Sequence, residues 1–502
     1  MAEYFEYLRL MIIEVFADIG NFIAAPWRTI PSNFEVYGNY FDTHSPNFGF
    51  WGWFFFILFL LIFLALIAGL GYLIFIFGRK YVRFVKKEID KDELREQVER
   101  LNYELFQSIQ EKDKILNLKT QYLGLSDPSK MRPEDKDTLE EVNSRFSKLI
   151  VVDHQYSGKD MTIEPVENLS LEELCNSFRH FAASQLHLYY TIDTIRQLFA
   201  GMGTGKLIIL EGISGTGKTS MPYALGKFFN FDANICPVQP SWKDRSELLG
   251  YYNEFTKKFN ESEFLRALYV STYRKDTNII VLDEMNLARI EYYFAEFLSI
   301  MEMPNVNDWK IELIGSAQSS DPKKLEEGKL LIPQNVYFFG TANNDDSTFT
   351  ISDKVYDRAI SLFFDNKGIP FECEYQESMS IPFEQINRLF DEAKNQYPIS
   401  PKVLEKFNEL DKFVIKKFKL AFGNRILKQL TSFIPVYVAC GGAELDGLDF
   451  IFTNKILKKF ESLNIAFLKD ECKELNGMLD KLYGKGTFKM AHAFIDNLIK
   501  MN

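Results

Sequence analysis

A glycine-rich stretch that ends in lysine and threonine is the first part of the sequence whose residue types could carry out chemistry. It reads Gly212-Ile-Ser-Gly-Thr-Gly-Lys-Thr219 and lies between the apolar run 207–210 and a segment that can be helical. At such a strand-to-helix turn, backbone N–H groups and the positive end of the helix dipole face phosphate oxygens. The stretch therefore predicts a nucleoside triphosphate site.

The residues of this loop have separate predicted roles. The Lys218 ammonium is expected to reach the β- and γ-phosphates, and the Thr219 hydroxyl to take a position on Mg²⁺. A similar stretch from Gly201 to Lys206 precedes the apolar run, so we interpret it as a helix end and turn. The other loop residues predicted to bind the nucleotide are Gly212, Ser214, Gly215, Thr216, Gly217 and Ser220.

Two later apolar runs end in polar residues that would complete the site. Residues 278–282 lead into Asp283 and Glu284, and a further run ends in Gly-Thr-Ala-Asn343. Asp283 is expected to hold Mg²⁺ through its water shell, and Glu284 to polarise the attacking water. The Asn343 amide, at a neighbouring strand end, is expected to orient the same water.

The elements that must position these residues follow an alternating pattern. Strand-like and helical segments alternate over residues 169–365, which predicts an α/β domain with a parallel sheet covered by helices on both faces. Strand signals then fade, and residues 366–502 are predicted to form a helical lid, with helices such as 401–418 and 447–463. The expected strands are residues 207–210, 235–238, 279–282, 336–340 and 359–364.

Composition limits the classes of function. The net charge of −11 argues against a whole-protein affinity for nucleic acid or anionic lipid, although it leaves room for a local basic patch. The five cysteines are scattered and odd in number, which fits reduced thiols. The five histidines are equally dispersed, so their spacing defines no metal site.

The N-terminal part contains a long uncharged run. The 28 residues from Phe50 to Phe77 carry no charge, and roughly 20 apolar residues suffice to cross a bilayer. We therefore predict a transmembrane helix within residues 49–78. Basic residues follow this run, whereas residues 1–48 contain Arg9 and Arg28 against six acidic residues. The positive-inside rule then places the C-terminal body in the cytoplasm and the N-terminus outside the inner membrane.

Three further N-terminal segments have different predicted structures. Residues 1–48 include an amphipathic helix, which would lie on the membrane, pack against copies of itself, or belong to an ordinary soluble structure. Residues 79–125 are charged and carry leucine and valine at seam spacing, which fits a short coiled coil or a single stalk helix. Residues 126–168 are interpreted as a linker.

The order of these motifs resembles that of an AAA+ ATPase. A phosphate loop, an acidic strand end, Gly-Thr-x-Asn, Asp357-Arg358 and a helical lid follow one another. The stretches 240–250 and 283–298 are similar to the McrB-like branch, which belongs with the MoxR and dynein-related group. The resemblance covers roughly residues 169–460. It implies a ring, usually a hexamer, with ATP or GTP and Mg²⁺ bound between subunits.

The resemblance also implies roles for individual residues. Asn343 matches the sensor-1 asparagine, Arg358 the arginine that reaches a neighbour's γ-phosphate, and Arg425 the sensor-2 arginine of the lid. Arg358 would otherwise form a salt bridge with Asp357 or Asp353. Arg289 would act across an interface or pair on its own surface. The GTP-using restriction enzymes carry Met-Asn-Thr-Ala-Asp-Arg-Ser at sensor 1, and this chain differs there, so ATP is favoured.

Three functions compete at this level. The leading prediction is a membrane-tethered ring motor that drives or gates a partner effector, in the manner of McrB-like proteins that work with a nuclease in defence against foreign DNA. The second is a MoxR-like chaperone that remodels membrane or envelope proteins, and the third is a nucleotide-gated assembly that perturbs the membrane. The fragment Glu471-Cys-Lys473 is interpreted as solvated surface and not as a nuclease site. Direct binding of nucleic acid is left open.

Overall fold

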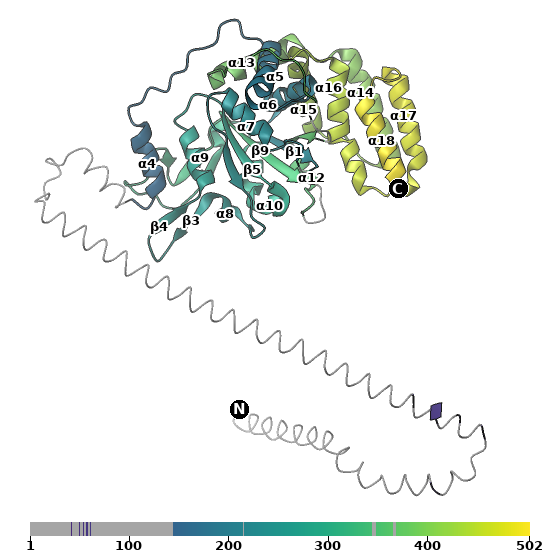
Figure 1. Ribbon diagram of the computed structural model, residues 1–502, viewed down its shortest axis with the longest axis horizontal. Helices are drawn as coiled ribbons and strands as arrows, with labels where there is room; N and C mark the ends of the chain where they lie inside the picture. Colours follow the sequence, from purple (N-terminus) through teal and green to yellow (C-terminus); the bar gives the residue numbers. More distant parts are fainter. Residues whose placement is uncertain are drawn as a thin grey trace, which may run out of the picture. The chain divides into compact units, whose positions relative to one another are not determined.

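The computed structural model describes residues 144–213, 215–343, 348–364 and 368–501, together with residues 42, 50, 54, 57, 58 and 61. The chain divides into the units Met1–Tyr122 and Leu123–Asn502, and the second contains all the labelled elements of Figure 1. Apart from those six positions, the predicted membrane span, the segment 1–48 and the stalk lie outside the described residues. Among the residues that are described, no helix is long and apolar enough to cross a membrane.

Five parallel strands form the centre of the second unit. Their order is β10-β1-β9-β5-β2, and in the register Gly212 pairs with Asn343 while Leu282 pairs with Gly340. The phosphate loop and the Asp283–Glu284 pair therefore reach the same edge of the sheet. The five predicted strands are confirmed as β1 (Leu207–Gly212), β2 (Asn234–Pro237), β5 (Asn278–Asp283), β9 (Val336–Asn343) and β10 (Ile360–Phe364).

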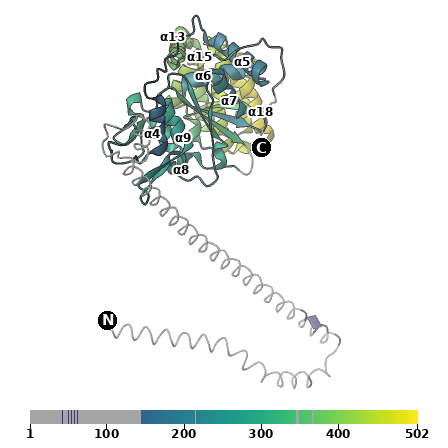
Figure 2. The same cartoon turned by 60° about the vertical axis from the view of Figure 1, so that its left-hand side comes forward.

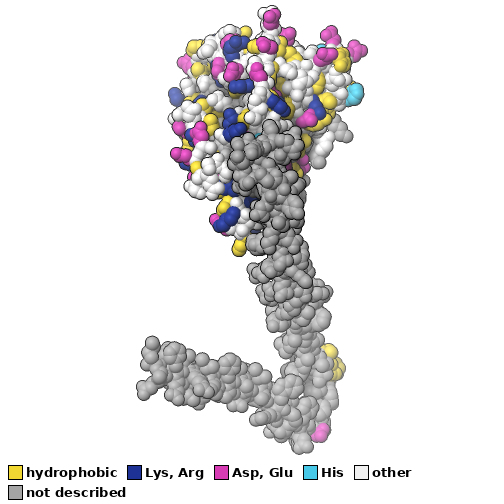
Figure 3. Space-filling model, turned by 90° about the vertical axis from the view of Figure 1, so that its left-hand side faces the viewer, with side chains coloured by type: hydrophobic (Ala, Val, Ile, Leu, Met, Phe, Trp, Pro, Cys, Tyr) yellow, Lys and Arg dark blue, Asp and Glu magenta, His cyan; other side chains and the backbone are white. Residues whose placement is uncertain are grey.

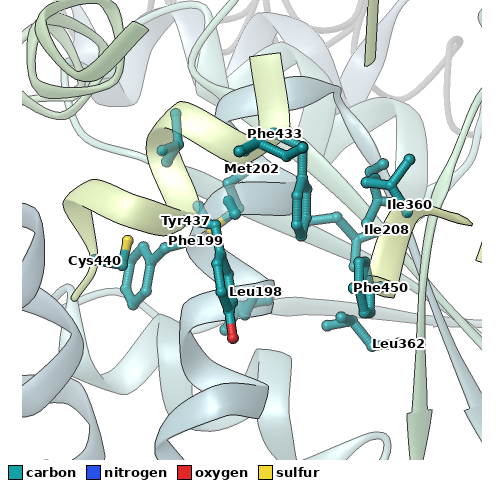
Figure 4. Close-up of a cluster of buried hydrophobic side chains, with 14 of the residues drawn as sticks. Leu198, Phe199, Met202, Ile208, Ile360, Leu362, Phe433, Tyr437, Cys440 and Phe450 are labelled. Carbon is teal, nitrogen blue, oxygen red and sulfur yellow. The ribbon is translucent and has the colours of Figure 1, made fainter. Parts of the chain in front are cut away.

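One face of the sheet is covered by helices from both ends of this unit. Side chains of α6 (Ile192–Thr204) and α15 (Asn424–Ala439) pack together over Ile208, Ile360 and Leu362 (Figure 4). The stretch that resembles a second phosphate loop ends α6, as predicted. A Cβ at Gly203 would lie 3.0 Å from Val436 Cγ2, so glycine permits this close helix contact. Helices α5 (Leu171–Leu186) and α7 (Ser220–Phe228) complete the layer.

The C-terminal region is helical, as predicted, but it does not have a core of its own. Its buried side chains are continuous with those of α5, α6 and the sheet, because the apolar face of α15 packs directly on α6. The predicted helix 447–463 is divided into α16 and a short 3₁₀ turn, η5 (Leu457–Ser462). The helices are α13 (Phe383–Gln396), α14 (Pro401–Phe418), α15, α16 (Glu444–Lys455), α17 (Lys469–Tyr483) and α18 (Lys489–Met501).

The opposite face carries a helix within the stretch interpreted as a linker. Helix α4 (Ser147–Tyr156) buries Leu149 and Val152 in a hydrophobic cluster separate from the one that contains the side chains of α6 and α15. Its Asp153 carboxylate accepts hydrogen bonds of 2.5 Å from the hydroxyls of Tyr269 and Tyr273. Residues 147–156 are thus an integral part of the body. The linker interpretation is therefore wrong for these residues. The sequence shows little sign of the helix, because the apolar run that α4 buries is short and follows a charged stretch.

Two small antiparallel sheets are further additions that the sequence pattern does not predict. A hairpin is formed by β3 (Gly250–Asn253) and β4 (Lys258–Glu261). The second sheet has the order β6-β8-β7. Its strands are β6 (Lys310–Glu312), β7 (Leu325–Glu326) and β8 (Lys329–Leu331). Five short helices complete the body, of which α8 and α9 are labelled in Figure 2: α8 (Arg245–Leu249), α9 (Glu263–Ser271), α10 (Ile290–Tyr293), α11 (Ala295–Ile300) and α12 (Asp353–Tyr356). On the face of the molecule shown in Figure 3, basic and acidic side chains of the described residues are interspersed.

Candidate active site

The glycine-rich loop connects β1 to α7 and has the backbone shape that its glycines permit. Gly212, Gly215 and Gly217 have φ values of 138°, 81° and 93°, which favour glycine. A Cβ at Gly212 would lie 2.3 Å from the Phe364 carbonyl oxygen. The Lys218 ammonium donates to the carbonyl oxygens of Gly212 at 3.0 Å and Ile213 at 2.9 Å, so it lies inside the curl of the loop, where phosphates would bind.

The two residues predicted to hold Mg²⁺ are in direct contact. The Thr219 hydroxyl donates to Asp283 Oδ1 at 2.9 Å, and the Thr341 hydroxyl donates to the same oxygen at 2.8 Å. Hydroxyl and carboxylate oxygens are the hard ligands that Mg²⁺ prefers. Thr219 and Asp283 therefore fit such an ion, which would neutralise charge on the phosphates.

Glu284 is fixed at the end of β5 by two neighbours. Its φ of 54° and ψ of 46° put it in the left-handed region, which costs energy for a residue other than glycine. Its N–H donates to the Thr341 hydroxyl at 2.8 Å, and its carboxylate oxygens accept from Asn343 Nδ2 at 2.8 and 2.6 Å. Asn343 Oδ1 is buried without a hydrogen-bond partner among the described residues. A free acceptor beside a carboxylate suits a bound water.

Thr341 and Asn286 are positioning residues that the sequence analysis misses. Asn286 is buried, and its Nδ2 donates to the Asn343 carbonyl at 2.8 Å while its Oδ1 accepts from the Asn343 N–H at 3.3 Å. This double contact fixes the end of β9 against the turn after β5. Thr341 lies two residues before Asn343, and Asn286 lies two residues after Glu284. This closeness in sequence to predicted site residues could have identified both of them.

A pocket of about 430 Å³ joins these groups to the loop before α6. Residues 187–190 form its far side, and they too are missed, because no chemical motif marks them. A Cβ at Gly368 would lie 2.0 Å from the Tyr189 carbonyl oxygen, so residue 368 packs tightly on this loop. The pocket is lined by Gly215, Thr216, Gly217, Lys218, Thr219, Ser220, Glu284, Asn343, His187, Leu188, Tyr189, Tyr190 and Gly368, whereas Ser214 lies outside the described residues.

The structure does not bring Arg358 and Arg425 to this pocket. Both lie with Glu302 at a second cavity of about 530 Å³, which Leu207 at the start of β1 also lines. Arg358 Nε is 2.9 Å from Glu302 Oε2, and Arg425 Nε is 2.7 Å from Glu302 Oε1. Arg358 thus pairs with Glu302, which neither alternative named. Arg425, predicted as the sensor-2 arginine that binds the nucleotide, lies at the opposite edge because α15 packs beside the strand starts.

The distance between the two edges follows from strand geometry. A strand rises about 3.3 Å per residue, so six-residue β1 separates its two ends by roughly 20 Å. An arginine side chain does not span that distance. Arg289 lies elsewhere, with its guanidinium 5.3 Å from the centre of the Phe349 ring. On α17, Lys473 is exposed and Glu471 is half-buried.

The sheet order, the glycine-rich loop and the acidic strand end together define a nucleotide-binding domain of the AAA+ class. Residues 207–359 match the family model described as AAA domain (dynein-related subfamily). The match supports the predicted class and, with it, a general nucleoside triphosphatase activity.

Two known proteins are similar to part of this chain. The chain is 23% identical over 216 residues to the type IV methyl-directed restriction enzyme EcoKMcrB subunit of Escherichia coli K12. The aligned part is 41% of this chain and 43% of that relative, so less than half of the relative is matched. The crystal structure of a candidate ATPase from Cytophaga hutchinsonii has a TM-score of 0.40 at 14% identity and covers 61% of this chain and 87% of its own.

Proposed function

We propose that the protein is a ring-forming AAA+ ATPase whose hydrolysis of ATP drives or gates a separate effector subunit. The observation that carries this proposal is the division of catalytic groups between opposite edges of one sheet. The phosphate loop, Glu284 and Asn343 share one pocket, and Asp283 is bonded to Thr219 of that loop, whereas Arg358 and Arg425 lie at the other edge. Two copies in contact would complete one site.

The chemistry of phosphoryl transfer explains why a second copy is needed. Negative charge builds on the γ-phosphate as its bond breaks. An arginine positioned to stabilise that charge raises the rate of hydrolysis by about 10³-fold or more. Lys218 supplies a cation from the same chain. Arg358 is about one-quarter exposed and would supply the second cation to a neighbouring chain.

Subunit mixing tests this arrangement. Full-length Arg358→Ala and Lys218→Ala proteins should each be inactive, and their mixture should regain part of the ATPase activity. Some mixed interfaces then combine an intact phosphate loop with an intact arginine. Arg388→Ala, which removes an exposed arginine on α13, serves as the control and should keep full activity alone. Verified subunit exchange without recovered activity would reject a catalytic role for Arg358 in trans.

The effector and the location extend this proposal. The similar E. coli protein is named as a subunit of a restriction enzyme, so we propose an effector with nuclease activity and a role in defence. The uncharged run from Phe50 to Phe77 would attach the ring to the inner membrane. Purification of the native complex with its anchor tests both points, because a nuclease supports this function and a folded envelope client supports the chaperone alternative.

A further inference from the structure

The short segment that carries Arg358 is held by the C-terminal helices. Lys455, the last residue of α16, donates from Nζ to the Tyr356 carbonyl at 2.6 Å and also to the Ala359 carbonyl. These two carbonyls flank Arg358. The side chain of Lys459 forms an ion pair of 2.8 Å with Asp357, which adds a second contact from the same region.

Burial makes the Lys455 contact unusual. The residue is 3% exposed, and a buried ammonium costs energy unless its hydrogen bonds are made. The pKa of Lys455 is lowered to about 7, mainly by burial; Asp357 opposes this shift, and Lys459, Arg425 and Lys458 add to it. The two carbonyls on either side of Arg358 supply these hydrogen bonds. The buried ammonium and the segment that carries Arg358 therefore hold each other in place.

The same run of residues also contacts the strand that leads into the phosphate loop. Lys458 Nζ lies 2.5 Å from Glu211 Oε2, and the Tyr356 hydroxyl donates to that oxygen at 3.0 Å. Glu211 is fully buried and directly precedes Gly212. Residues 455–459 therefore contact both the end of the strand that precedes the phosphate loop and the segment that carries Arg358.

We propose that Lys455 is a positioning residue for Arg358, through which the C-terminal helices set where that arginine lies. The proposal rests on the proposed function, in which Arg358 acts on the nucleotide of the adjacent subunit. A misplacement of about 1 Å in a catalytic group can reduce a rate by up to about 100-fold. Lys455 therefore serves catalysis in the neighbouring site and leaves nucleotide binding in its own site unaffected.

The test uses Lys455→Met in the full-length protein. We expect kcat to fall by about 10- to 100-fold, with the KM for ATP and the assembly state unchanged. Lys406→Met is the matched control, because the Lys406 ammonium also donates to a carbonyl, that of Leu482, far from Arg358. The control should keep the wild-type kcat. If Lys455→Met does not fold, Lys459→Met tests the same segment at a half-buried position.

Complementation then assigns the defect to one side of the interface. Lys455→Met mixed with Lys218→Ala should regain activity, whereas Lys455→Met mixed with Arg358→Ala should not. The opposite pattern, or a folded Lys455→Met with unchanged kcat, overturns the proposal. The mixture of Arg358→Ala with Lys218→Ala is measured in parallel. Its failure would reject the proposed function, so the two ideas fail by different results.

Discussion

At the scale of single residues, the site is arranged around the carboxylate of Glu284. Asn343 contacts both of its oxygens, and Thr341 holds its backbone N–H. These contacts keep a left-handed residue in place at the end of β5, where its carboxylate faces the pocket shared with Lys218. The arrangement suits a group that must activate a water beside a bound phosphate.

Replacing Glu284 by glutamine should separate binding from hydrolysis. The amide has nearly the same shape but cannot act as a base, so ATP hydrolysis should fall by about 100-fold, while nucleotide binding is retained. Phosphate release and binding of a fluorescent nucleotide measure the two properties. Glu312→Gln, which changes an exposed carboxylate of β6, should alter neither, and full turnover in Glu284→Gln would reject the assignment.

At the scale of elements, the sequence predicts what local patterns encode. Each of the five central strands is a short apolar run, and the loop 212–219 carries its motif in consecutive residues. The helix α4 and the loop 187–190 are not predicted, because their roles depend on partners distant in the chain, such as Tyr269 for Asp153. Arg425 follows the same rule, since its edge of the sheet is decided by the packing of α15 on α6.

The start of α18 offers a prediction about pH. The Asp449 carboxylate of α16 accepts from the N–H groups of Met490 and Ala491 at 2.8 and 2.9 Å. Burial nevertheless raises the pKa of Asp449 to about 6. Between pH 4 and 6 the folded chain then binds more protons at this residue than the unfolded chain. The protonated Asp449 carboxyl therefore favours the folded chain, relative to the ionised form, by about 3 kcal/mol. This contribution to stability is present at low pH and is lost as the pH rises through 6.

Asp449→Asn removes this titration. The difference in unfolding free energy between wild type and variant should therefore change between pH 4 and 6. The wild type should become less stable relative to the variant as the pH rises. Denaturant unfolding at a series of pH values measures it. Asp446→Asn, an exposed position on the same helix, should give a difference that does not vary with pH. A constant difference for Asp449→Asn would show that its carboxyl titrates normally.

At the scale of the whole molecule, the predicted attachment to the membrane can be tested by labelling. Asn33→Cys should react with an impermeant thiol reagent in intact cells, and Lys136→Cys only after permeabilisation, because basic residues follow the run from Phe50 to Phe77. A Cys373→Ser background removes the native thiol that is half-exposed, since the other four are buried. Reversed labelling would overturn the orientation, and release of the protein by carbonate would overturn the span.

The separation of the arginines from their own phosphate loop has a consequence for the cell. Under the proposed arrangement an isolated chain holds only half of the groups that a turnover requires, however much nucleotide is present. Activity then rises more steeply than the amount of protein, because contacts between copies form by mass action. Expression level would act as a threshold, below which the enzyme is silent. Confinement to a membrane plane would lower that threshold by crowding the copies together.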